Sequence, residues 1–138
     1  MLNIECWITT QSLFWIHVYS QGEGEYYWKT SIQFALDIIV LYKKMVKQKE
    51  YVLSKQLLRS STSIGAHVQE AQAAHTIPVF AFNMSIASKE ARESRYWLML
   101  IEKSQIVEAN VIELSRQAES IVNILTKIVK TSQASLKR

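Results

Sequence analysis

Two runs of small and apolar residues at helical spacing dominate the stretch from Leu53 to Trp97, and the only proline, Pro78, separates them. Both runs advance in alternating steps of three and four residues, which places each run on one face of a helix. The first run is Leu57, Ser61, Ile64, Val68, Ala71 and His75, and the second is Met84, Ala87, Ala91, Ser94, Leu98 and Ile101. Because many members are small, the pattern predicts a helical hairpin whose arms pack closely against other helices.

The rest of the composition favours long helices in one domain. The chain has 138 residues, three glycines and one proline, which suits few turns and argues against a many-turned β fold. The single cysteine, Cys6, excludes an internal disulfide and suits a reducing cytoplasm, where we expect the protein to reside. We interpret Cys6 as a small hydrophobic residue and not as a reactive thiol.

Residues 1–28 differ from the rest and are interpreted as an N-terminal extension. They hold three of the four tryptophans and no Lys or Arg, so they lack the basic start of a signal peptide. Polar residues interrupt the apolar run, so no membrane span is expected. Cys6–Ile8 and Leu13–Tyr19 favour a strand or short hairpin, and residues 21–24 favour a flexible joint. Such an extension packs on its own domain or on a neighbouring subunit, or it contributes little to the fold.

Four helices are predicted over residues 29–49, 54–76, 78–105 and 110–131. They form an all-α, antiparallel, up-and-down four-helix bundle over 29–132, followed by a frayed basic tail at 133–138. In the first helix, one apolar stripe is expected from Ile32, Ala35 or Leu36, Ile39, Tyr42 or Lys43, and Val46. Ser54 is the expected N-cap of the second helix, and Asn110 with Glu113 resembles a capping box before the fourth. The fourth helix should bury Leu114, Ala118, Ile121, Leu125 and Ile128.

No residue pattern in the chain predicts catalysis, a metal or a cofactor. His67 and Glu70 are three residues apart and His75 follows, but bundle metal sites need Glu-x-x-His on two helices, and that spacing is missing. There is also no His-Glu-x-x-His motif and no phosphate-binding glycine loop. We therefore expect a protein that is not an enzyme, with histidines that are buried and satisfied or simply exposed.

Basic residues gather in two places, near the end of the first helix and at the C-terminus. The candidates for nucleic-acid binding are Lys43, Lys44, Lys47, Lys49, Lys55, Arg59, Lys127, Lys130, Lys137 and Arg138. Cations at a helix C-terminus are also favoured by the helix dipole, so the first group has a structural explanation as well. An up-and-down bundle places the two groups at opposite ends, and a ring of subunits would repeat each of them.

Arg59 and the pair Tyr96-Trp97 have alternative interpretations. Arg59 can form an ion pair with Glu70, Glu90 or Glu93, or it can contact phosphate. Tyr96-Trp97 is expected to anchor a core or an interface, because base stacking would need both rings exposed. On the outer face of the third helix, Lys89 and Glu93 are four apart, so this charge is expected to pair along the helix.

Several motifs of the second and third helices resemble one protein family. They are Leu53-Ser54-Lys55-Gln56-Leu57-Leu58-Arg59-Ser60, Thr62-Ser63-Ile64-Gly65-Ala66, Glu70-Ala71, Ser85-Ile86-Ala87, Lys89-Glu90-Ala91 and Tyr96-Trp97-Leu98. Together they resemble the four-helix-bundle family encoded by intervening sequences in bacterial 23S ribosomal RNA genes, over roughly residues 28–131. The sequence departs from the family pattern at His67, where asparagine is usual, and at Thr76–Phe80, which replaces a more polar turn.

The resemblance implies an up-and-down bundle that assembles into a homopentameric ring, with Ile64, Gly65, Tyr96 and Trp97 at the subunit interface. The accessory variability proteins of diversity-generating retroelements share this architecture, and they bind nucleic acid and a reverse transcriptase. The first hypothesis is therefore a non-catalytic, homopentameric accessory protein that binds RNA or DNA electrostatically. The alternative is a scaffold that holds a partner enzyme, such as a reverse transcriptase, through apolar surface near residues 1–28.

Overall fold

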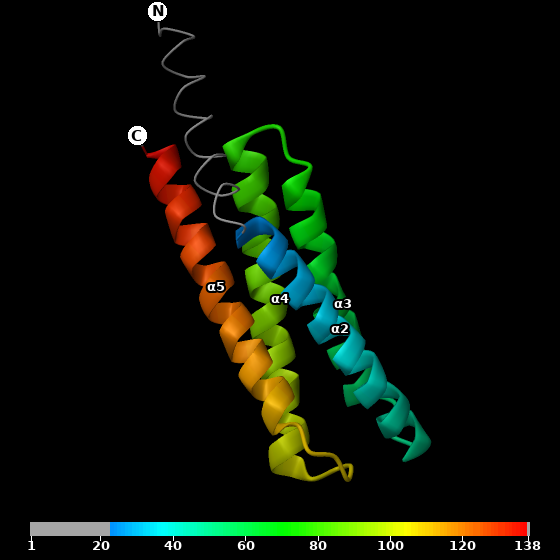
Figure 1. Cartoon of the computed structure of the whole chain (residues 1–138). Helices are drawn as coiled ribbons and strands as arrows, with labels where there is room; N and C mark the ends of the chain where they lie inside the picture. The colour runs from blue at the N-terminus through cyan, green and yellow to red at the C-terminus, as the bar shows by residue number, and fades with distance from the viewer. Residues whose placement is uncertain (1–22, 138) are drawn as a thin grey trace, which may run out of the picture.

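The computed structural model describes residues 23–137, and all of their regular structure is helical. The four helices are α2 (Glu23–Lys47), α3 (Leu53–Gln72), α4 (Ile77–Ser104) and α5 (Ile112–Leu136). They run alternately up and down in an antiparallel bundle (Figure 1). The predicted all-α bundle is confirmed. The strand or hairpin expected at Cys6–Ile8 and Leu13–Tyr19 lies outside the described residues, as does Arg138.

Helices that follow one another in the chain also pack side by side. The main contacts join α2 to α3, α3 to α4 and α4 to α5, and a smaller contact between α2 and α5 closes the bundle. α2 and α4 therefore occupy diagonal corners, and each turns one face away from the other three helices (Figure 1). None of the described helices is long and apolar enough to cross a membrane.

The two runs around Pro78 form the centre of the core. All six residues of the α4 run are buried, from Met84 to Ile101, and so are the first five residues of the α3 run. His75 is the exception: it is exposed, because α3 ends at Gln72 and the chain has left the helix. The small residues do bring the helices close together, as expected. Between α3 and α4 the fully buried Ser60 and Ser94 touch through their hydroxyl groups.

The apolar stripe expected on the first helix is wrong. α2 buries Phe34, Ile38, Leu41 and Met45, whereas Ile32, Leu36 and Val40 are 37%, 51% and 69% exposed. The reason is that α2 is apolar on almost every side, so its helical period fits two opposite faces equally well. The face with the phenylalanine and the methionine fills the core, and the aliphatic face of Ile32, Leu36 and Val40 is left outside.

α2 also begins six residues earlier than expected, at Glu23, so Glu23 and Gly24 belong to its first turn and not to a flexible joint. It ends at Lys47 with a left-handed residue, Lys49, whose φ is 65°. The amide of Lys49 donates to the carbonyl of Val46 at 2.9 Å, and the amide of Glu50 donates to the carbonyl of Met45 at 3.0 Å. These are the two hydrogen bonds of a Schellman motif, which here closes α2 without a glycine.

The N-terminus of α3 is capped by Glu50 and not by Ser54. The buried Glu50 carboxylate accepts the backbone N–H groups of Val52, Leu53 and Ser54 at 3.0, 2.8 and 2.8 Å. Ser54 lies inside the first turn, and its hydroxyl donates to the carbonyl of Glu50 at 2.9 Å. A carboxylate can cap a helix as well as a serine can when it accepts hydrogen bonds from amides two to four residues later. The sequence pattern alone does not distinguish these two caps.

The ends of α4 match the prediction, and those of α5 do not. Thr76 caps α4 and Pro78 lies in its first turn, as Pro78 was expected to do. Before α5, Asn110 accepts the amide of Ile112, but Glu113 pairs with Arg116, so no capping box forms. α5 continues through Leu136 because Ser132 is buried against the bundle, so the tail is helical and not frayed up to that point.

Candidate nucleic-acid interface

Five lysines predicted to bind nucleic acid gather around the turn between α2 and α3. They are Lys43, Lys44, Lys47, Lys49 and Lys55, and all five are exposed. Within residues 23–137, none of these five lysines forms an ion pair. The ion-paired lysine in this range is Lys29, which bonds to Glu25. The nearby Glu50 carboxylate is buried and is occupied by three backbone amides. The turn therefore presents cations whose charge is not neutralised by a bonded carboxylate.

This lysine turn, defined as residues 43–55, is held in place by hydrogen bonds. The side-chain amide of Gln48 donates to the carbonyl of Glu108 at 3.0 Å, and its oxygen accepts the backbone amide of Glu108 at 2.8 Å. This pair ties the turn to the loop between α4 and α5. Together with the Schellman motif and the Glu50 cap, it fixes the backbone that carries the lysines.

The second basic group lies at the other end of the bundle. Lys127 and Lys130 are exposed on the C-terminal half of α5, and Lys137 is exposed directly after its end. Figure 1 places the end of α5 far from the α2–α3 turn. The expected separation of the two groups is confirmed for these residues. One chain therefore presents two distinct cationic ends.

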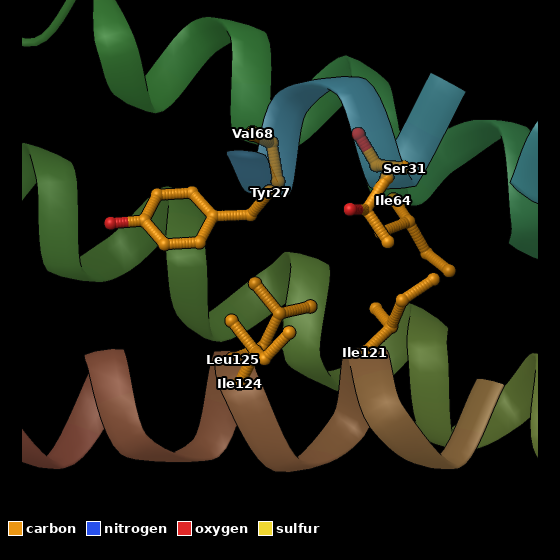
Figure 2. Close-up of a pocket in the computed structure, with 8 residues that line it drawn as sticks. Tyr27, Ser31, Ile64, Val68, Ile121, Ile124 and Leu125 are labelled. Carbon is orange, nitrogen blue, oxygen red and sulfur yellow. The ribbon is translucent and has the colours of Figure 1, made fainter. Parts of the chain in front are cut away.

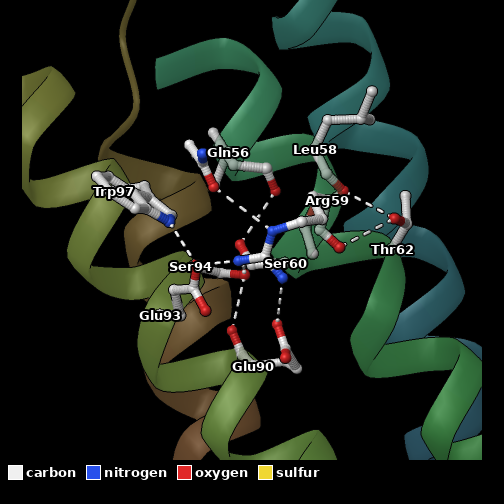
Figure 3. Close-up of polar contacts among 11 residues, drawn as sticks. Gln56, Leu58, Arg59, Ser60, Thr62, Glu90, Glu93, Ser94 and Trp97 are labelled. Carbon is white, nitrogen blue, oxygen red and sulfur yellow. Dashed lines mark hydrogen bonds and ion pairs between the residues drawn. The ribbon is translucent and has the colours of Figure 1, made fainter. Parts of the chain in front are cut away.

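Arg59 differs from the lysines because its guanidinium group is occupied. It bonds to Glu90 at 3.2 Å and to Glu93 across the α3–α4 contact (Figure 3). The ion-pair interpretation is confirmed with these two carboxylates, and Glu70 is not involved. Burial raises the pKa of Glu93, but hydrogen bonds from Arg59 and Trp97 outweigh it and lower the pKa. Arg59 can therefore contribute little to phosphate binding without giving up these bonds.

Two of the four residues assigned to a subunit interface pack within the chain. Ile64 is fully buried in the core of its own bundle, which excludes it from surface contact with a partner. Gly65 faces α2, where an added Cβ would lie 3.5 Å from Ser31 Oγ.

The aromatic pair is more accessible than a core anchor would be. Tyr96 is 48% exposed, and Trp97 is half-buried. Their rings meet edge to face with centroids 5.2 Å apart, and the Trp97 indole N–H donates to Glu93 at 3.1 Å. A core position is therefore wrong for Tyr96, whose ring reaches solvent.

Charges on α4 pair between helices and not along the helix as expected. Arg95 bonds to Glu119 of α5 at 2.7 Å, and Arg92 donates to the hydroxyl of Thr126 at 2.8 Å. Glu93 bonds to Arg59 and forms no ion pair with Lys89, although the charge of Lys89 still helps to lower the pKa of Glu93. Lys89 and Lys103, expected on the outer face of this helix, are exposed and form no ion pair in the described chain, but neither was among the predicted nucleic-acid contacts. Their spacing of fourteen residues, or two heptads, places both lysines on the same face of the helix, and this was the sequence signal for a shared cationic surface.

His67 and His75, the histidines in the described part of the chain, form no metal site. His67 Nδ1 lies 3.6 Å from Glu70 Oε2, which is too long for a hydrogen bond. His75 is exposed beyond the end of α3. Within the described part of the chain, no three His, Cys, Asp or Glu side chains come together as metal ligands would.

A very small cavity and a larger, open groove lie between the helices of the bundle. Side chains from α2, α3 and α5, including Tyr27, Ile64 and Leu125, line a cavity of about 10 Å³, which holds at most one water molecule (Figure 2). The groove, of about 330 Å³, lies between α2 and α5 and is lined by Val40, Leu41, Lys44, Asp37, Ala109, Asn110, Glu113, Leu114 and Gln117.

Comparison with known proteins agrees with this architecture. A model of the 23S rRNA-intervening sequence protein family matches residues 26–127. The chain is also similar to a crystal structure from Bacteroides thetaiotaomicron, described as a protein of unknown function from the S23 ribosomal protein family. The two are 38% identical, the TM-score is 0.73, and the match covers 78% of this chain and 97% of the other. None of the curated proteins compared with the chain matches it. With the family model spanning most of the bundle, the chain belongs to the 23S rRNA-intervening sequence protein family.

Proposed function

We propose that this protein is a non-catalytic accessory factor that binds nucleic acid electrostatically through the lysine turn. The observation that carries this proposal is the group of five exposed lysines, none bonded to a carboxylate, on a backbone fixed by Gln48 and Glu50. Lysine ammonium groups bind phosphates as point charges, and phosphate contacts carry no sequence information, so the binding would be tolerant of sequence. A chain with one cysteine suits a cytoplasmic site for this activity.

The same proposal includes assembly into a homopentamer, as the family resemblance implies. The observation in support is the outer face of α2, where Ile32, Leu36 and Val40 lie one above another and are exposed. A contiguous exposed aliphatic face of this kind marks an interaction site, so this face is the natural site for a second copy. A ring would present the lysine turn several times, which raises the affinity for a long polyanion through multivalency.

A binding titration with charge variants at the two ends of the bundle, compared per charge removed, tests the proposed site. Replacing Lys43, Lys44, Lys47 and Lys55 by Gln, and Lys49 by Gly, removes five charges from the lysine turn. The control replaces Lys127, Lys130 and Lys137 by Gln at the other end. The measurement is fluorescence anisotropy of a labelled mixed-sequence RNA duplex and its DNA counterpart. We expect the first variant to lose at least tenfold in affinity and the control to lose much less. Equal losses in both variants would contradict a localised site.

A second candidate function is a scaffold for a partner enzyme such as a reverse transcriptase. The groove between α2 and α5 favours it, because about 330 Å³ beside Val40 and Leu114 can accept side chains of a partner. Replacing Asn110 by Trp would fill the groove from its exposed rim. Loss of co-purification with a co-expressed reverse transcriptase, with an unchanged molar mass, would support this candidate; unchanged co-purification would argue against it.

A further inference from the structure

The outer face of α4 carries an uninterrupted stripe of exposed residues at heptad spacing. It lies opposite the buried run of the same helix, and all of its members are exposed. In chain order they are Phe82, Ser85, Lys89, Arg92, Tyr96, Met99 and Lys103. The stripe contains two aromatic rings and three cations but no carboxylate. Phe82 is 66% exposed and Tyr96 is 48% exposed, which is unusual for aromatic residues with no partner chain over them.

The charge on this stripe is available to a ligand. In the described chain Lys89 and Lys103 form no ion pair, and Arg92 donates to a neutral hydroxyl group, that of Thr126. Glu93 borders the stripe, but its carboxylate is occupied by Arg59 and Trp97. The free charge along this face of α4 is therefore positive, and it complements a polyanion.

Tyr96 is held in position by a chain of contacts. Its ring meets the edge of Trp97, the indole of Trp97 donates to Glu93, and Glu93 is bonded to Arg59 of the neighbouring helix. Figure 3 shows the second part of this chain, from Trp97 through Glu93 to Arg59. A ring whose orientation is fixed in this way loses little conformational entropy when a flat ligand stacks on it.

We infer that the outer face of α4 is a track for single-stranded nucleic acid. Bases of the strand stack on Phe82 and Tyr96, which lie about 21 Å apart along the helix axis, and phosphates meet Lys89, Arg92 and Lys103. Unpaired bases expose their π-faces to aromatic side chains, and this stacking tolerates any sequence. A duplex keeps its bases stacked on each other and can use only the cations of the stripe. The stripe therefore prefers a single strand.

The outer faces of α2 and α4 differ in chemistry, so each suits a different binding partner. The middle of the outer face of α2 is aliphatic at Ile32, Leu36 and Val40, before the face reaches Lys43 and Lys47, so this middle part suits a second copy. The outer face of α4, on the diagonal corner of the bundle, alternates rings with cations, which suits a nucleic acid. This inference builds on the proposed nucleic-acid binding, but it concerns a different surface and a different form of the ligand.

The test compares a labelled oligo(dT) single strand with a duplex of oligo(dT) and oligo(dA) of the same length. The variant replaces both Phe82 and Tyr96 by Ala, and a conservative variant, Tyr96→Phe, keeps the ring. The matched control is Tyr26→Ala, which removes a tyrosine that is 58% exposed on α2. Thermal unfolding and molar mass are measured for every variant, so that a change of fold or assembly is seen directly.

We expect the double Ala variant to lose on the order of tenfold or more in affinity for oligo(dT), with duplex binding almost unchanged. Tyr96→Phe and Tyr26→Ala should both bind as the parent does. Unchanged oligo(dT) binding by the double variant would overturn the inference, as would a fall in molar mass, which would assign this face to a subunit contact. If the duplex still binds through the lysine turn, the proposed function survives that result. If neither ligand binds the parent protein, both proposals fail.

Discussion

The hydroxyl oxygens of Ser60 and Ser94 lie 2.8 Å apart at the buried contact between α3 and α4. Ser60 donates to the carbonyl of Leu57, and the single hydroxyl proton of Ser94 is shared between Ser60 Oγ and the carbonyl of Glu90, which lies 3.0 Å away in its own helix. The small side chains let the two helices approach closely, and the paired hydroxyls satisfy the polar groups that this approach buries. Ser94 belongs to the run of small and apolar residues in α4, and Ser60 directly precedes Ser61 of the run in α3.

A larger residue at this contact should destabilise the fold. Ser94→Leu adds volume where both side chains are fully buried, so we expect it to lower the free energy of unfolding by about 1–3 kcal/mol. Ser94→Ala removes only the hydroxyl group, and about 1 kcal/mol is expected. Urea unfolding followed by circular dichroism measures both values. Ser120→Leu, on the exposed side of α5, is the control, and an equal loss there would contradict this account.

Glu50 should give the stability a dependence on acid pH. Burial tends to raise its pKa, but the backbone N–H groups of Ser54, Leu53 and Val52 outweigh burial and hold the pKa below its ordinary value of 4.5. The folded state therefore binds the Glu50 proton more weakly than the unfolded state does. This contribution to stability is present above pH 4.5 and is lost as the pH falls through the lower, folded pKa.

Glu50→Gln should remove this dependence. The variant keeps a side-chain oxygen to accept amides but has no charge, so we expect it to lose about 0.5–2 kcal/mol at neutral pH. Its unfolding free energy should change less between neutral and acid pH than that of the parent. Urea unfolding at a series of pH values measures the difference, and parallel curves for the two proteins would show that Glu50 is not the group responsible.

Gly65→Ala should be tolerated and even stabilising. The glycine lies in the middle of α3, and an added Cβ would be 3.5 Å from Ser31 Oγ and 3.8 Å from Ser31 Cβ, both ordinary contacts. Alanine restricts the unfolded chain and favours the helix, so we expect a gain of about 0.4–1 kcal/mol. Thermal unfolding of Gly65→Ala measures it. A clear loss of stability would mean that α2 and α3 pack more tightly than the structure shows.

A charge on the outer face of α2 should disrupt assembly without unfolding the bundle. Leu36→Lys places a cation in the middle of the exposed aliphatic face, where covering it would bury an unpaired charge. We expect the molar mass from light scattering to fall from that of the proposed pentamer to that of a single chain, with an unchanged circular dichroism spectrum. Gln69→Lys, on the exposed side of α3, is the control. A pentamer that persists in Leu36→Lys would assign the contact to another face.

The sequence predicted the bundle well wherever the residue types on the two sides of a helix differ. In α3 and α4 every residue of the two predicted runs that lies within its helix is buried, but the runs left out further buried residues such as Ser60, Phe80 and Ser88. α2 is apolar on both sides, so periodicity could not choose between Phe34 and Leu36 as core residues. That choice depends on how well side chains of a given size fill the space between α3 and α5.

The candidate site was only partly predictable for a related reason. The lysines at the end of α2 stand out in the sequence, but whether a cation is free depends on carboxylates from other helices. Arg59 is occupied by Glu90 and Glu93, more than thirty residues away, while Lys43 and Lys47 meet no such partner within the described residues. The Glu50 cap and the Gln48–Glu108 pair likewise arise from the three-dimensional path of the loops.

The salt dependence of RNA binding tests the central claim most directly. Affinity for a labelled duplex RNA should be measured at several salt concentrations for the parent protein and for the variant that lacks the five charges of the lysine turn. Binding through phosphates releases counterions, so log K should fall linearly with log salt, by roughly 0.9 per phosphate contact on the scale known for duplex DNA. We expect a steep slope for the parent and a much shallower one for the variant. A flat response in the parent, or the same slope in both proteins, would contradict electrostatic binding at the lysine turn.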